Sequence, residues 1–212
     1  MKTKWFSGTL PRLRRSAGAL TRDCRGLAAI EFALIVPLML VLFFGTVEFS
    51  SGVAVDRKVT LVARTLSDLT SQSAMPMTDG YLQNIFTASI AILAPYTATP
   101  TTATLSEIYI DSTKVAKIQW SESATVGSGA TQATLTASSR NAGDVVTTLV
   151  PPDLLVKQTY VILSEVSYLY KPAVGYVMGK SGIKLSDVSY TRPRQVTCVI
   201  YNNVPNSSCP TP

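Results

Sequence analysis

The chain of 212 residues contains no histidine. This absence excludes histidine-based acid–base catalysis, Ser-His-Asp and Cys-His nucleophilic pairs, and most zinc and haem sites. Only three cysteines are present, too few for a disulfide scaffold or a four-cysteine metal cluster. Charged residues are also scarce, at 15% of the chain against 46% hydrophobic residues. This balance is too apolar for a disordered tail and indicates a membrane-attached protein.

The net charge of +6 is concentrated at the N-terminus. Residues 1–26 contain seven basic residues and a single acid, Asp23, whereas the remaining 186 residues hold 12 bases and 12 acids. Because no basic excess remains on the rest of the chain, the charge does not indicate a nucleic-acid partner. The seven basic residues are Lys2, Lys4, Arg12, Arg14, Arg15, Arg22 and Arg25.

A long apolar segment follows this basic leader directly. Residues 27–47 carry one charge, Glu31, and twenty-one helical residues span about 30 Å, the thickness of the hydrocarbon core of a bilayer. We expect a single transmembrane helix here, because no later segment is as apolar. The positive-inside rule then places residues 1–26 in the cytoplasm and the chain beyond residue 48 across the membrane. Cleavage as an ordinary secretory signal is disfavoured, since no small-x-small site followed by a clear polar break ends the run.

The helix is expected to continue outside the bilayer as an amphipathic segment over residues 48–72. Its apolar residues recur at steps of four and three, which places them on one stripe of a helix. Pro37 removes a backbone donor and clashes with the preceding turn, so we predict a kink near residues 33–37. The stripe consists of Val55, Val59, Val62, Leu66 and Leu69.

Residues 73–212 predict an α+β ectodomain in which the long N-terminal helix packs on a small antiparallel β-sheet. A second helix is expected over Tyr81–Leu93. The serine-, threonine- and glycine-rich residues 121–143 predict a long flexible loop. Alternating patterns predict strands over Ala103–Asp111, Val115–Ser121, Val156–Tyr170 and Asp187–Tyr201.

The junction between the basic leader and the apolar run carries a short motif. Gly26 precedes Leu27, and Glu31-Phe32 stand fifth and sixth when Leu27 is counted as the first residue. This arrangement resembles the processing site of type IV pilins, where a prepilin peptidase cuts after the glycine. A carboxylate one turn inside the apolar helix needs a partner, such as the amine of a neighbouring subunit, because an unpaired charge there costs at least about 2.5–3.5 kcal/mol. The simpler interpretation is that Gly26 is only a flexible residue and that the Glu31 carboxylate reaches the headgroups.

The wider stretch from Gly26 to Phe49 resembles the TadE-like family, the pseudopilins of the tight-adherence (Flp pilus) system of bacteria. The resemblance rests on the lead-in of small residues, on Glu31-Phe32, on Pro37 within the span and on a Gly45-x-x-Glu48-Phe49 exit. It implies a non-catalytic subunit of the inner (cytoplasmic) membrane with a periplasmic domain. The implied partners are the prepilin peptidase, other pilins and pseudopilins of the system, the inner-membrane assembly platform and the lipid bilayer.

The three cysteines are divided by the expected topology. Cys24 lies in the leader, whereas Cys198 and Cys209 lie in what is expected to be an oxidising periplasm, with ten residues between them. We expect them to form a disulfide, which would stabilise the fold by about 2–3 kcal/mol; the alternative is two unpaired thiols.

No catalytic grouping is recognisable, and no cofactor or metal is expected. The acids Asp153, Glu165 and Asp187 are scattered, and Gly179-Lys180-Ser181 lacks the spacing of a phosphate-binding loop. The alternative to a processed pseudopilin is therefore not an enzyme either. It is an unprocessed single-pass membrane protein whose periplasmic domain binds a ligand or partner.

Overall fold

The computed structural model describes residues 26–172, 182–201 and 209. Most of the expected leader, Cys24 and the Gly179-Lys180-Ser181 segment therefore lie outside the described residues. The chain divides into two compact units, residues 1–47 and residues 48–212. This division falls where the apolar run of the sequence ends.

One helix, α2, spans Leu27–Ser71 and includes Pro37. Its apolar part is long enough to cross a membrane, and the most hydropathic window of eighteen residues is not buried at all. From Val55 onward, one stripe of the same helix is buried, and it includes four of the five apolar positions that the periodicity predicts: Val55, Val59, Val62 and Leu66. The fifth, Leu69, is partly buried against the same core. The predicted kink at Pro37 stays a prediction.

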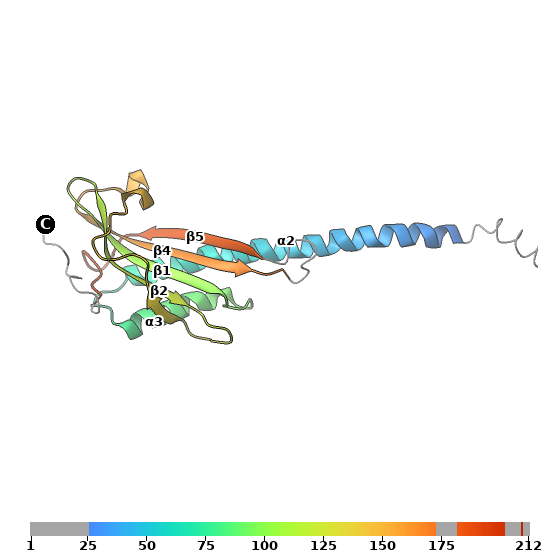
Figure 1. The fold of residues 1–212 in the computed structure, drawn as a ribbon, viewed down its shortest axis with the longest axis horizontal. Coiled ribbons are helices and arrows are strands. Elements are labelled where there is room, and N and C mark those ends of the chain that lie inside the picture. The colour runs from blue at the N-terminus through green and yellow to red at the C-terminus, as the bar shows by residue number, and fades with distance from the viewer. Residues whose placement is uncertain (1–25, 173–181, 202–208, 210–212) are drawn as a thin grey trace, which may run out of the picture. The chain divides into compact units, whose positions relative to one another are not determined.

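The globular unit, residues 48–212, combines this buried part of α2 with a second helix and one sheet (Figure 1). The helix α3 spans Asp79–Ile90, is capped by the Thr78 side chain, and continues as the 3₁₀ turn η2, Ala91–Leu93. Two further 3₁₀ turns, η3 (Thr147–Leu149) and η4 (Pro152–Leu154), precede the fourth strand. The strands are β1 (Thr101–Ile110), β2 (Ala116–Thr125), β3 (Thr134–Ala137), β4 (Thr159–Tyr170) and β5 (Ile183–Thr191).

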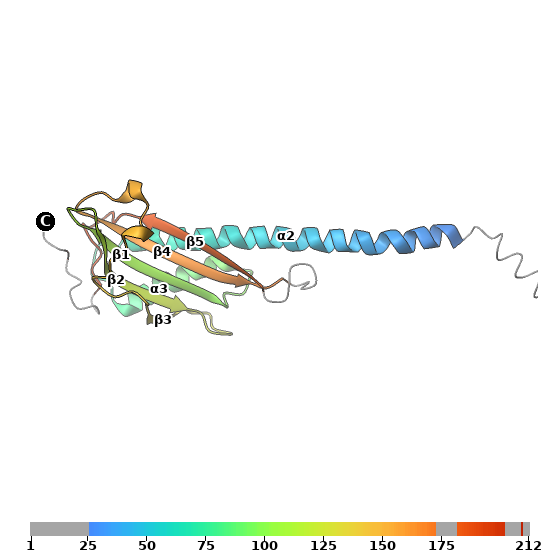
Figure 2. The same ribbon diagram turned by 45° about the horizontal axis from the view of Figure 1, so that its top comes forward.

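The sheet is antiparallel throughout, with strand order β3-β2-β1-β4-β5. Figures 1 and 2 show α2 and α3 on the same side of it, so this side is covered and the other is mostly open. The α+β fold with a long helix on a small antiparallel sheet is thus confirmed. The fit between α2 and the sheet includes polar contacts, since the buried Ser164 hydroxyl of β4 donates to the Ala63 carbonyl at 2.5 Å.

The two faces of the sheet carry two separate apolar cores. The helix-covered face holds the larger core, which includes Leu105 and Ile162 together with the α2 stripe. The other face holds a smaller core, including Ile108 and Val161, at the end of the sheet near η3 and η4. A shift of register in β1–β2 between Glu107 and Ile108 places Trp120 on the first face and Ile118 on the second.

The expected flexible loop over residues 121–143 is wrong in two places, at the start of that range and at residues 134–137. β2 continues to Thr125, and β3 pairs with residues 122–125 of β2. The prediction failed because it followed composition. Small hydroxyl residues fit a pleated sheet when cross-strand partners accept their hydroxyls, and such a contact joins Ser121 to Ser106 at 2.7 Å.

The remaining elements differ from their predicted bounds by a few residues, except at the last strand. α3 begins two residues before the predicted Tyr81, and β4 begins at Thr159 rather than Val156. β5 covers Ile183–Thr191 instead of Asp187–Tyr201. Pro193 cannot donate to a ladder, and the chain beyond it leaves the sheet.

Candidate functional site

The residues of the predicted processing motif lie at the start of α2. Gly26 immediately precedes the helix and is exposed, and a Cβ atom built on it would meet no heavy atom within 4 Å. Leu27 opens the helix with 59% of its side chain exposed, and Phe32 is 68% exposed. Glu31, one turn after Leu27, is exposed as well. Backbone and side chains at this junction are therefore accessible to a protease or to another subunit.

The other end of the apolar run contains a second acid in a different environment. Glu48 is only 4% exposed, and the Tyr170 hydroxyl of β4 donates to its Oε2 at 3.1 Å. Burial raises the pKa of Tyr170, and the neighbouring Glu48 carboxylate raises it further. Gly52 stands one turn later, where an added Cβ would lie 3.7 Å from the Tyr170 ring. The Glu48 of the exit motif thus attaches the helix to β4.

The C-terminal cysteines are joined in a disulfide, in agreement with the expected pairing. Cys198 is 2% exposed, and the backbone that follows it is inserted beside α3. The Met77 amide donates to the Ile200 carbonyl at 2.8 Å, and the Tyr201 hydroxyl donates to Asp79. The bridge therefore closes a loop whose first part is embedded in the larger core.

A buried acid that the sequence did not single out holds this same segment. Glu107 of β1 is fully buried and accepts the Val199 amide at 2.6 Å and the Trp120 indole N–H at 3.0 Å. The indole N–H also lies 2.7 Å from the Val199 carbonyl. Burial raises the pKa of Glu107 to about 8, although both hydrogen bonds lower it. Alternation within β1 does indicate which face Glu107 occupies, but it does not indicate that a distant segment covers that face.

The acids that the sequence left unassigned do not come together. Glu165 accepts from both terminal nitrogens of Arg140, the second at 3.0 Å, so it forms an ion pair on the open face of the sheet. Asp153 lies in η4, and the Asp187 carboxylate accepts its neighbour's amide, that of Val188. Within the described ranges, no group of three histidine, cysteine or acidic side chains is placed to hold a metal ion.

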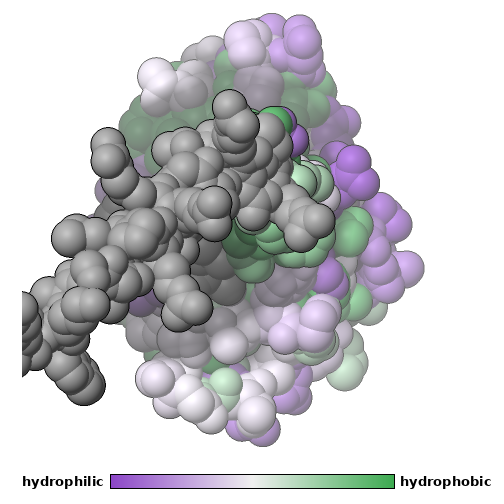
Figure 3. Space-filling model, turned by 90° about the vertical axis from the view of Figure 1, so that its right-hand side faces the viewer, coloured by the Kyte–Doolittle hydropathy of each residue, from purple (hydrophilic) through white to green (hydrophobic). Residues whose placement is uncertain are grey.

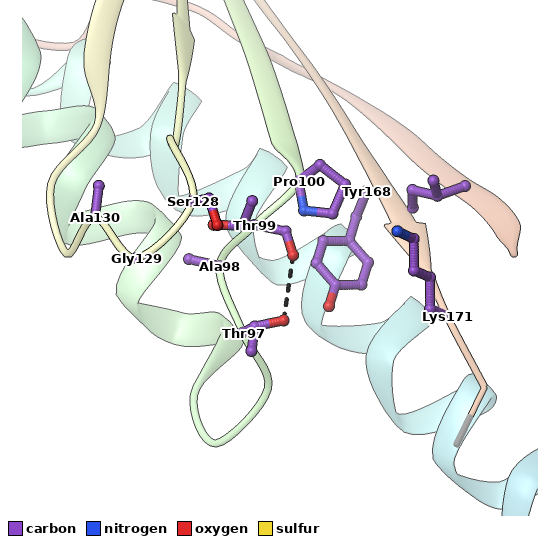
Figure 4. A pocket seen from close by; sticks show the side chains of 10 residues that line it. Thr97, Ala98, Thr99, Pro100, Ser128, Gly129, Ala130, Tyr168 and Lys171 are labelled. Carbon is purple, nitrogen blue, oxygen red and sulfur yellow. Dashed lines mark hydrogen bonds between the residues drawn. The ribbon is translucent and has the colours of Figure 1, made fainter. Parts of the chain in front are cut away.

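A cavity of about 580 Å³ lies between the segment before β1 and the end of β4. Figure 4 shows its lining, which comes from the 97–100 segment, from the 128–130 turn and from the side chains of Tyr168 and Lys171. The Thr97 hydroxyl donates to the Thr99 carbonyl at 3.2 Å within this lining. The lining offers hydroxyl and backbone groups together with the single cation of Lys171.

The comparison with protein families bears on the apolar span and on the part of α2 that follows it. Residues 26–67 match the family model described as TadE-like protein, which confirms the resemblance seen in the sequence. The match covers about a fifth of the chain, from the glycine before α2 to the buried stripe of that helix. No curated protein and no solved structure matches the chain. The family match and the one candidate membrane helix among the described residues fit a pilus-related, single-pass membrane protein.

Proposed function

We propose that this chain is a TadE-like pseudopilin, a non-catalytic component of tight-adherence (Flp) pilus assembly that a prepilin peptidase processes after Gly26. The observation that carries the proposal is the match to the TadE-like family, because it begins at Gly26 and includes the whole apolar run. The position of Gly26 supports it further, because this residue is exposed and a glycine presents no side chain to obstruct the cut.

Cleavage would change the electrostatics of the N-terminus. It would remove the +6 leader and leave a new amine at Leu27, one helical turn from Glu31. In an apolar medium, a carboxylate and an amine attract each other far more strongly than in water. Glu31 has no apolar cover in the described chain, so its partner would come from a neighbouring subunit. The span would thereby become competent to pack beside other pilins at the inner-membrane assembly platform, with the globular unit in the periplasm.

Electrophoretic mobility tests the processing step. The wild-type chain should lose its 26-residue leader only in cells that contain the peptidase, and Gly26→Ala should keep the leader in both backgrounds. Gly80→Ala is the matched control, because Gly80 is also exposed and an added Cβ there meets nothing within 4 Å. This variant should be processed like the wild type. Mass spectrometry of the N-terminus should place the cut between Gly26 and Leu27.

Identical mobility in all lanes would remove the processing proposal. Retention of the initiator methionine in protein from the native host would favour the second interpretation, an unprocessed single-pass membrane protein whose periplasmic domain binds a ligand or partner. The cavity of Figure 4, whose lining mixes hydroxyl groups with apolar side chains, would then be the first site to probe for a ligand.

A substitution at Glu31 tests the assembly role separately from insertion. Glu31→Ala makes the span more apolar, so membrane insertion should be retained while pilus formation is reduced. Glu31→Gln keeps the size of the side chain and should have the same effect, because the charge is what the neighbouring amine would recognise. Normal pili in cells that carry either variant would contradict a role for this carboxylate.

A further inference from the structure

The cavity of Figure 4 contains a buried hydroxyl group without a partner. The Tyr168 side chain is 5% exposed, and its ring belongs to the larger core. Its hydroxyl end lies at the cavity, and no hydrogen bond joins it to any residue that the structure describes. By contrast, the hydroxyls of Tyr170 and Tyr201 donate to carboxylates, those of Glu48 and Asp79 respectively. A buried hydroxyl is costly to leave unpaired, so the hydroxyl of Tyr168 is placed to bind something that enters the cavity.

The cavity lies at the end of the globular unit where β1 begins and β4 ends. Figure 3 views the unit from this end, and most atoms in the lower part of the picture belong to residues of intermediate hydropathy. Hydrogen bonds hold the cavity walls in place: the Thr99 hydroxyl donates to the Gly127 carbonyl at 2.9 Å, and the Leu169 amide donates to the Pro100 carbonyl at 3.4 Å. The cavity is therefore largely formed before a ligand enters. Its volume of about 580 Å³ lies within the range of about 300–1,000 Å³ that is typical of small-molecule sites.

The charge of the lining selects a ligand with one negative charge. Among the described residues that line the cavity, Lys171 carries the one charge; it is exposed, and in Figure 4 its amine end is directed towards Tyr168. An ammonium group on a ligand would find no carboxylate in this lining. A phosphate monoester, with a charge of about −1.5 to −2 at pH 7, needs more donors than one lysine supplies. A carboxylate is the anion that a single lysine balances.

The other polar side chains of the lining are hydroxyls. Those of Thr97 and Thr99 each donate to a backbone carbonyl, so they face a ligand as acceptors. The hydroxyls of Ser128 and Tyr168 can donate or accept. A ligand that complements these groups carries several hydroxyls of its own, together with C–H groups that contact the apolar ring of Pro100.

These requirements together describe an acidic sugar. We propose that the cavity binds a sugar that carries one carboxylate, with the Lys171 amine on the carboxylate and the Tyr168 hydroxyl on a hydroxyl of the sugar. Binding at this cavity requires neither cleavage after Gly26 nor pilus assembly, so it is an activity of the globular unit beyond the function proposed above.

Calorimetric titration of the full chain in micelles of a polyoxyethylene detergent, which contains no sugar, tests the ligand class. Methyl β-glucuronide is compared with methyl β-glucoside, and N-acetylmuramic acid with N-acetylglucosamine, so that each acidic sugar has a neutral counterpart. At least one acidic sugar should bind about tenfold more tightly than its counterpart, and added sodium chloride should weaken its binding. Binding of the glucuronide would indicate a uronic acid of a polysaccharide, and binding of the muramic acid would indicate peptidoglycan. Failure of both acidic sugars to bind, or equal affinity for the neutral sugars, would overturn the proposal and would show that water alone satisfies the Tyr168 hydroxyl.

Substitutions in the cavity test the two assigned groups. Lys171→Gln should lower the affinity for the acidic sugar about tenfold, and Tyr168→Phe should lower it severalfold. Tyr168→Phe breaks no hydrogen bond of the described chain, so the fold should be retained. The matched controls are Lys184→Gln, at an exposed lysine of β5 outside the lining, and Tyr160→Phe, which removes another buried hydroxyl without a partner from β4. Both controls should bind like the wild type, and a loss in the controls equal to that in the cavity variants, or no loss in either cavity variant, would refute the site.

Discussion

The buried Glu107 makes the stability of the globular unit depend on pH in an unusual direction. In the unfolded chain, the pKa of this carboxyl is near 4.5, and burial under Val199 and Trp120 raises it to about 8 in the fold. A raised pKa means that the folded state prefers the protonated acid. The favourable effect is therefore complete below pH 4.5, and stability is lost as the pH rises from 4.5 through 8.

The size of the effect follows from the difference between the two pKa values. One pKa unit corresponds to 1.36 kcal/mol, so the fold should lose about 4–5 kcal/mol over this interval. A loss of this size is comparable to the whole stability of a marginal domain. Glu107→Gln keeps the size of the side chain and an acceptor for the Val199 amide, but it cannot ionise. At pH 5 the variant should lie within about 1 kcal/mol of the wild type, and at pH 9 it should be more stable by about 4–5 kcal/mol.

Urea unfolding of the full chain in neutral detergent micelles measures this difference. In a Trp5→Phe background, the tryptophan fluorescence reports on Trp120 alone, which lies in direct contact with Glu107, and the disulfide is left intact. Asp153→Asn serves as a control, because it removes an exposed acid and should preserve the pH dependence of the wild type. Equal pH dependence in the wild type and in Glu107→Gln would refute the reasoning.

Three further substitutions test the other contacts of the globular unit, each measured by urea unfolding at pH 7. Cys198→Ser breaks the bridge to Cys209 and should cost about 2–3 kcal/mol under non-reducing conditions, whereas added reductant should destabilise the wild type but not the variant. Tyr170→Phe leaves the buried Glu48 without this hydrogen bond and should cost about 1–3 kcal/mol, and no measurable loss would mean that the carboxylate is satisfied elsewhere. Gly52→Ala should stabilise by about 0.5–1 kcal/mol, since alanine favours the helix and its Cβ would make an ordinary 3.7 Å contact; destabilisation would show that the approach to Tyr170 requires glycine.

The helices of this protein could be predicted from the sequence because their signals are local. The apolar run and the stripe beginning at Val55 each depend on spacing within one segment, and both appear in α2 where expected. The strand β4 was also predictable, since its alternation places Ile162 and Val161 on opposite faces, in opposite cores. The motif at Gly26 could be predicted for the same reason, because it is defined by residue types at fixed positions within one segment.

The contacts that join distant segments could not be predicted in this way. Composition suggested a loop where β3 in fact pairs with β2, because the partners of its small polar residues come from other strands. The path of the chain after Thr191 was wrong for a similar reason, since the segment around Val199 is held by Glu107 and Trp120 rather than by a strand ladder.

The sequence by itself determined the apolar span, its charged leader, the amphipathic continuation of the helix and the α+β class. The span and the amphipathic helix follow from the hydrophobic pattern of a single segment and the free energy of removing it from water, the leader follows from the distribution of charge, and the class follows from the order of helix and strand patterns. Only the tertiary structure decided that Glu48 is bound by Tyr170, that Glu107 is buried beneath the C-terminal segment, and that Phe49 shares a groove with Ile183. These pairs lie 122, 92 and 134 positions apart along the chain, and their contacts depend on how two helices cover one face of a twisted sheet.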